Sequence, residues 1–195
     1  MQAKSSKPFD VYVADAWKSL PGGIQDVEAS LPGALALITD GDQIPELVRL
    51  AMHVLGERLG RWEDGVKYLL KIERLPQYDA KSEGGRAVNR ALACLELASG
   101  LKTSLRGYSP SDQIRVLSAC SVILSSHKKS ERAWQMIGEI QQLFSTAGLP
   151  PDDPAHGELV ICADRMARNL KEKPWRTEKD ELLLLLVTQL SNRPL

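Results

Sequence analysis

Apolar residues recur along most of the chain at the three-to-four-residue spacing of amphipathic helices, and the strict alternation typical of strands is scarce. Near the start, Phe9, Val13 and Trp17 follow one another a helical turn apart on one face. Prolines, glycines and short polar runs interrupt the pattern at intervals. The pattern therefore predicts an all-α chain of short-linked helices.

We expect these helices to form antiparallel hairpins, because connections of about two to eight residues return a chain alongside itself. A single domain over 1–195 would contain hairpins at 8–40, 43–76, 86–126 and 130–171, followed by a capping helix at 177–192. Stacked hairpins form an α-solenoid, and a compact bundle is the alternative arrangement.

Several helix boundaries carry local signals. Asp42, Ser109 and Thr177 are candidate N-caps, and the last two precede an acidic residue in a capping-box pattern. Gly60 and Gly148 are placed where a helix C-terminus favours glycine. The polar stretch 77–85 predicts a linker before the next helix.

One stretch, 43–76, resembles a tetratricopeptide repeat, which is a helix, a tight turn and a second helix over about 34 residues. Leu55-Gly56 is similar to the Leu-Gly pair of the family's first helix, and Gly60-x-Trp62-x-x-Gly65 to its turn. Pro76 is similar to the closing proline. The resemblance implies a tetratricopeptide-like right-handed superhelix of α-hairpins.

That resemblance also implies a function: a non-enzymatic scaffold, adaptor or chaperone-like, that binds a peptide or helix of another protein in a concave groove. The polar residues expected to line such a groove are Arg49, His53, Glu57, Arg86, Asn89 and Arg90. Arg86 and Arg90 lie a turn apart and are spaced to hold a carboxylate. The alternative is a helical sensor with a small-molecule pocket between hairpins.

Charge and motifs narrow the function classes. Lys plus Arg equals Asp plus Glu at 25 each, so the basic excess typical of nucleic-acid binding is missing. No HExxH or phosphate-loop motif occurs, so we expect no enzyme activity, cofactor or metal. Cys94, Cys120 and Cys162 are far apart in sequence, which favours reduced thiols in a core.

The longest apolar run, Leu182–Val187, is far below the roughly 20 residues of a membrane span, and the first eight residues contain no apolar signal segment. We expect a cytoplasmic protein without membrane contact. Six consecutive apolar residues surround most of a helix. Either the chain buries both sides, or a homodimer forms through Leu182, Leu183, Leu185 and Leu186.

Overall fold

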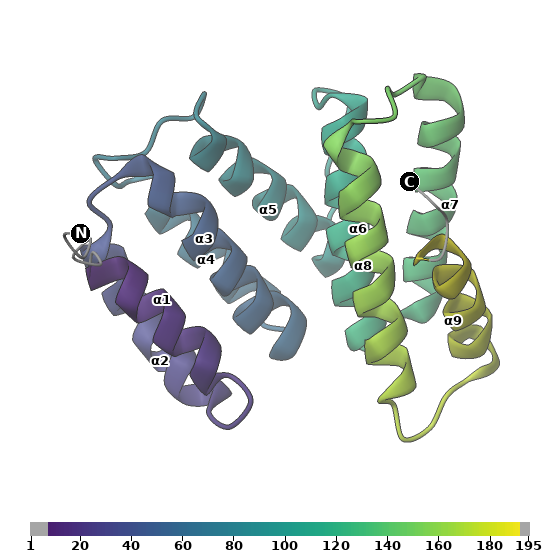
Figure 1. Cartoon of the computed structure of the whole chain (residues 1–195), viewed down its shortest axis with the longest axis horizontal. Coiled ribbons are helices and arrows are strands. Elements are labelled where there is room, and N and C mark those ends of the chain that lie inside the picture. The colour runs from purple at the N-terminus through teal and green to yellow at the C-terminus, as the bar shows by residue number, and fades with distance from the viewer. Residues whose placement is uncertain (1–7, 192–195) are drawn as a thin grey trace, which may run out of the picture. The chain divides into compact units, whose positions relative to one another are not determined.

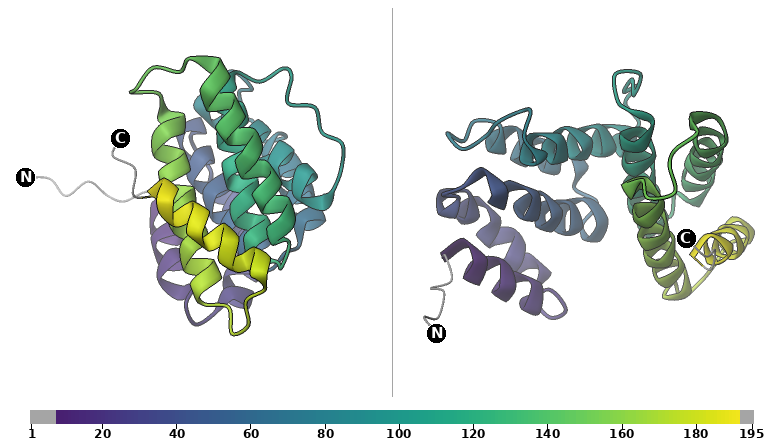
Figure 2. Two further views of the ribbon diagram at one scale, coloured as in Figure 1. Left: turned by 90° about the vertical axis from the view of Figure 1, so that its right-hand side faces the viewer. Right: turned by 45° about the horizontal axis from the view of Figure 1, so that its top comes forward.

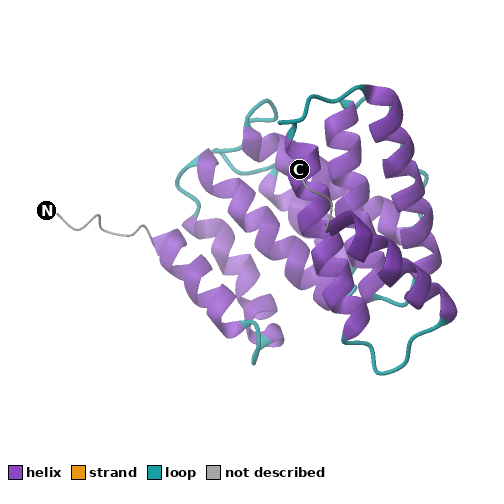
Figure 3. Ribbon diagram, turned by 45° about the vertical axis from the view of Figure 1, so that its right-hand side comes forward, coloured by secondary structure: helices purple, strands orange, loops and turns teal. Residues whose placement is uncertain are grey.

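A computed structural model describes residues 8–191, and all regular structure within that range is helical (Figure 3). The predicted all-α class is therefore confirmed. Within the same range, no helix combines the length and the apolar composition of a membrane span.

The chain divides into two compact units at residues 92 and 93, inside the helix α5 (Glu83–Ser99). The first unit contains α1 (Pro8–Ser19), α2 (Ile24–Ala34), η1 (Leu35–Leu37), η2 (Gly41–Gln43), α3 (Ile44–Ala51), η3 (Met52–Arg58) and α4 (Trp62–Ile72). The second unit contains α6 (Pro110–Ser126), α7 (Ser130–Ala147), α8 (Pro154–Lys171) and α9 (Glu178–Ser191) (Figure 1).

In the first unit, α1 packs against both α2 and α3, and α4 packs against α3 and η3. The segment η3 also contacts α2. The first helix of the second hairpin, which consists of α3 and η3, therefore packs on both helices of the first hairpin. The core of this unit is built from large side chains that are almost fully buried: Phe9, Leu31, Ile44, Leu47, Leu50, Leu69 and Ile72.

The predicted helix over 43–59 changes its winding halfway. The chain is α-helical only to Ala51, and Met52–Arg58 forms a π-helix, in which hydrogen bonds span five residues. At its end Leu59 donates to the carbonyl of Val54 over 3.0 Å, and the Trp62 indole donates to the carbonyl of Gly56 over 3.1 Å. Gly60 follows with φ of 64°, as its predicted C-terminal position requires.

The fifth helix begins earlier than the sequence predicts, because Gly84 and Gly85 belong to its first turn rather than to the linker. A Cβ on Gly84 would lie 3.1 Å from the Ile44 side chain, and one on Gly85 would lie 2.3 Å from the Asp79 carbonyl. The two glycines therefore permit close packing of the α5 start.

In the second unit, α6 packs extensively against both α7 and α8, and α9 contacts α8 and α7 (Figure 2). Each helix thus has two main neighbours, and α7 packs on α6 and α9 although α8 follows it in the chain. This is the neighbour order of a four-helix bundle. The shared core includes Ile114, Leu124, Ile137, Met166 and Leu183.

Most predicted caps are present. Ser109 accepts a hydrogen bond from the Asp112 amide, and the Thr177 hydroxyl accepts one from the Asp180 amide. Gly148 has φ of 58° at the end of α7. The predicted cap at Asp42 is displaced by two residues, because Asp40 is the N-cap and forms a capping box with Gln43.

Candidate partner-binding site

Three side chains form a connected aromatic and ionic group on α1 and α3. The Trp17 indole donates to Glu46 Oε1 over 3.0 Å, and Arg49 donates to both Glu46 oxygens over 2.6 and 2.9 Å. The Arg49 guanidinium also lies 4.6 Å from the centre of the Trp17 ring, within cation–π range. The hydrogen bonds from Arg49 lower the pKa of Glu46, so that side chain is ionised at neutral pH.

The group continues into the π-helix through His53. Its ring centre lies 5.3 Å from that of Trp17, and His53 Nδ1 is 2.8 Å from Glu57 Oε2. The Glu57 side chain is only 7% exposed, so this carboxylate orients His53 rather than facing a partner. We name Trp17, Glu46, Arg49, His53 and Glu57 the Trp17 cluster.

Beside the Trp17 cluster, an open groove of about 380 Å³ runs between α1 and the start of α3. Its lining combines apolar, acidic and amide side chains: Phe9, Asp10, Val13, Ala14, Trp17, Asp42, Gln43 and Glu46. Trp17 and Glu46 belong to both the cluster and the groove, so an occupant of the groove would contact the cluster.

The other predicted contact residues lie on α5. Arg86 and Arg90 both pair with Glu83, at 3.2 and 2.7 Å, so the carboxylate that they were predicted to hold is supplied by their own helix. Arg86 is exposed, whereas the Arg90 side chain is 13% exposed and Asn89 is half-buried. Of these three residues, Arg86 is the most accessible to a partner.

Of the four leucines predicted for a homodimer, two face solvent. Leu182 and Leu185 are 47% and 63% exposed, and Leu186 is partly exposed. Leu183 is completely buried inside the second unit and cannot contribute to a surface contact. A homodimer through α9 stays a prediction, and it depends on Leu182 and Leu185.

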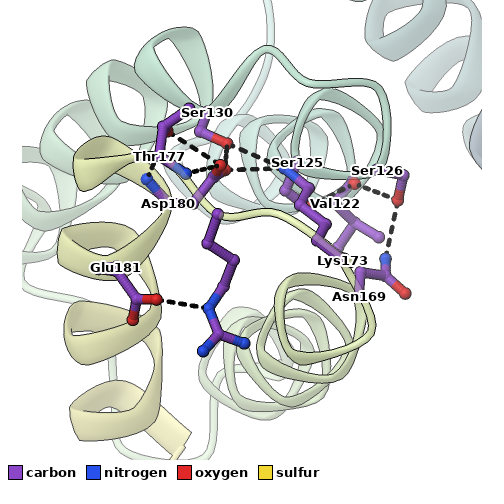
Figure 4. Close-up of polar contacts among 10 residues, drawn as sticks. Val122, Ser125, Ser126, Ser130, Asn169, Lys173, Thr177, Asp180 and Glu181 are labelled. Carbon is purple, nitrogen blue, oxygen red and sulfur yellow. Dashed lines mark hydrogen bonds and ion pairs between the residues drawn. The ribbon is translucent and has the colours of Figure 1, made fainter.

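A buried polar network in the second unit resembles catalytic groups by residue type (Figure 4). Lys173 Nζ donates to Asp180 over 2.7 Å and lies 3.3 Å from Ser130 Oγ, which itself donates to Asp180. Burial raises the pKa of Asp180, but the hydrogen bonds from Lys173 and Ser130 outweigh burial and hold it well below its ordinary value. The Ser130 side chain is only 6% exposed and donates its proton to Asp180. The network therefore links the start of α7 to α9 and to Lys173 in the loop between α8 and α9.

The second unit also has a half-open cavity of about 460 Å³, lined by residues of α5, α6, α7 and the segment 103–105. Its inner lining is apolar, with Leu97, Leu117 and Met136, and polar side chains such as Gln142 border it. The volume is within the range of small-molecule sites.

The three cysteines are reduced and buried in the second unit. A hydrogen bond with Cys120 and burial raise the pKa of the Cys94 thiol well above its ordinary value. No group of metal-ligating side chains suited to an ion occurs within residues 8–191.

Three of the predicted contact residues, Arg49, His53 and Glu57, lie in the Trp17 cluster. Trp17, Glu46 and the groove residue Gln43 were not among the predicted contacts. Trp17 fits the apolar stripe of α1, so the helical pattern assigns it to the core and does not predict its hydrogen bond to Glu46. Gln43 carried a usable signal, because Asp40-x-x-Gln43 is a capping-box pattern just before an apolar helix.

The chain matches no family model, no curated protein and no solved structure.

Proposed function

We propose that this protein is a cytoplasmic, non-enzymatic protein-interaction module whose first unit binds a peptide or helix of a partner in the groove between α1 and α3. The observation that carries the proposal is the groove beside the Trp17 cluster. Trp and Arg supply much of the binding energy at protein interfaces, and here both project from rigid helices.

The packing of the first unit favours a tetratricopeptide-like scaffold. In such stacks the first helix of one hairpin packs on both helices of the previous hairpin, as α3 and η3 do on α1 and α2. The buried Gly56 and Gly65 lie in η3 and α4, which pack together as the resemblance implies. We propose that the groove is the partner-facing surface of that stack.

The test is affinity capture of partners from lysate with wild-type protein and two charge-reversal variants. Asp10→Lys reverses the charge of an exposed groove residue, and Asp15→Lys makes the same charge change at an exposed position of α1 outside the groove lining. We expect Asp10→Lys to lose a partner that Asp15→Lys retains. Equal recovery by both variants would show that the groove is not the binding surface.

The cavity of the second unit favours a second candidate function, a small-molecule sensor. Gln142→Trp would place an indole at an exposed lining position and obstruct the cavity. A metabolite that raises the melting temperature of the wild type, but not of this variant, would support the sensor.

A further inference from the structure

The cavity of the second unit is lined largely by aliphatic side chains. Leu117 and Met136 are buried at its inner wall. Three further leucines of the lining are partly exposed: Leu97, Leu105 and Leu143. Apolar side chains of a folded core usually pack together without gaps larger than a water molecule. A cavity of about 460 Å³ with this lining is an exception, and an apolar occupant would bury the partly exposed leucines.

The outer wall of the cavity belongs to the connection between α5 and α6. Residues 100–109 form this connection, which is longer than any other between the helices of the second unit. Two side-chain hydrogen bonds hold it in place. Thr103 donates to Glu96 over 2.9 Å, and Gln113 donates to the Tyr108 carbonyl over 3.0 Å. The wall is thus anchored to both helices, and the cavity remains behind it.

The only ionic group among the described lining residues is a carboxylate. Glu139 of α7 borders the cavity, and the rest of the polar lining consists of uncharged hydroxyl and amide side chains: Thr103, Gln113, Gln142 and Thr146. The C-terminal turn of α7, which contains Thr146, has no basic residue, so the partial negative charge of this helix end adds to that of Glu139. A cationic group is therefore the electrostatic complement of the lining, and an anion would be repelled.

We infer that the cavity binds a compact apolar amine, with its apolar body against Leu105, Leu117 and Met136 and its ammonium group at Glu139. Burial of the body supplies most of the affinity, because an ion pair with an exposed carboxylate contributes little. Glu139 instead selects the sign of the ligand charge. The inference rests on the sensor function proposed as the second candidate and names the class of its ligand, and peptide binding by the first unit does not depend on it.

The experiment is isothermal titration calorimetry of the full chain with two series of probes, one with an indole body and one with a phenyl body. Each series contains an ethylamine, an ethanol and a propionate side chain, so its members differ mainly in charge. Gln142→Trp obstructs the cavity, and Gln141→Trp places the same side chain at the exposed neighbouring position outside the lining. Glu139→Gln removes the lining carboxylate, and Glu172→Gln removes an exposed carboxylate elsewhere in the second unit. Circular dichroism melts verify that each variant folds.

We expect the amine of at least one series to bind the wild type and Gln141→Trp equally well and to lose measurable binding to Gln142→Trp. The neutral alcohol should bind several-fold more weakly than the amine, and the propionate more weakly still. Glu139→Gln should weaken binding of the amine several-fold without changing that of the alcohol, and Glu172→Gln should change neither.

A propionate that binds as tightly as the amine, or an amine that binds Glu139→Gln as tightly as the wild type, would overturn the inference while leaving the cavity as a small-molecule site. An amine that still binds Gln142→Trp would be bound outside the cavity, which would overturn the inference as well. Absence of binding in both series would also overturn it, and the melting comparison of wild type and Gln142→Trp with other metabolites would then decide the sensor function separately.

Discussion

Tyr68 shows how one polar atom joins two helices inside an apolar core. Leu31 lies near the end of α2, where backbone carbonyls lack partners within the helix, and the Tyr68 hydroxyl of α4 donates to its carbonyl over 2.8 Å. Burial, with a smaller effect of Tyr12, raises the pKa of Tyr68 well above its ordinary value. The hydroxyl therefore stays protonated and remains a donor.

Tyr68→Phe should destabilise the first unit by about 1–2 kcal/mol, because it leaves the buried Leu31 carbonyl without a donor. Urea denaturation measures the loss. Tyr78→Phe is the matched control, since Tyr78 is partly exposed and outside the core. Equal stability of the two variants would show that the Tyr68 hydrogen bond contributes nothing.

Residue identity alone predicted only part of the Trp17 cluster. Charged residues on a helix face, such as Arg49, are recognisable from sequence because the periodicity places them on the polar side of the helix. Trp17 was not, since periodicity assigns an aromatic residue to the core regardless of a hydrogen bond to Glu46. Such pairs depend on how α1 packs against α3, and a single sequence does not contain that distance.

At the scale of elements, local chemistry was the reliable guide. Ser109 and Thr177 cap the starts of α6 and α9, and Gly148 caps the end of α7, as predicted, because capping depends on neighbours in sequence. The π-helix was not predictable, since its stripe of apolar residues also suits an α-helix. Likewise, the sequence predicts a linker at Gly84-Gly85, because consecutive glycines are typical of loops. Only the close packing of Gly84 on Ile44 shows why glycines occur in the first turn of α5.

The start of α9 should make the stability of the second unit dependent on pH. Asp180 has a lowered pKa in the folded chain, so its contribution is complete above the unfolded pKa of about 4 and is lost as pH falls below it. Asp180→Asn should cost roughly 3 kcal/mol at neutral pH, because it leaves the half-buried Lys173 without its counter-charge.

Urea denaturation at neutral pH and at about pH 3 separates these effects. The wild type should lose about 1 kcal/mol more than Asp180→Asn on acidification, since other carboxylates titrate equally in both proteins. Lys179→Ala is the control, because its pair with Glu131 is exposed on both sides and contributes at most about 1 kcal/mol. An identical pH dependence in wild type and Asp180→Asn would contradict the assignment.

At the scale of the whole molecule, both units show the same periodic spacing of apolar residues, but their helices pack on different sets of neighbours. Apolar spacing predicted helices in both, but it does not say whether a helix packs on its sequence neighbour. The α1–α2 hairpin packs on α3 and η3, whereas α7 and α8 share α6 as a neighbour. Side-chain volume across several helices decides between these outcomes, and turn length alone does not.

All three cysteines lie in the second unit, so their reactivity reports on that unit separately. Thiol reagents attack the thiolate, and the raised pKa and burial of Cys94 make the folded unit slow to react. Labelling should therefore require opening of the second unit, with a rate set by its stability.

Asp180→Asn should accelerate labelling roughly a hundredfold, following its loss of about 3 kcal/mol. Tyr68→Phe, which weakens the core of the first unit, should leave the rate nearly unchanged. Acceleration by Tyr68→Phe in proportion to its destabilisation would show instead that both units unfold in one cooperative step, and fast labelling of the wild type would place the thiols outside the core.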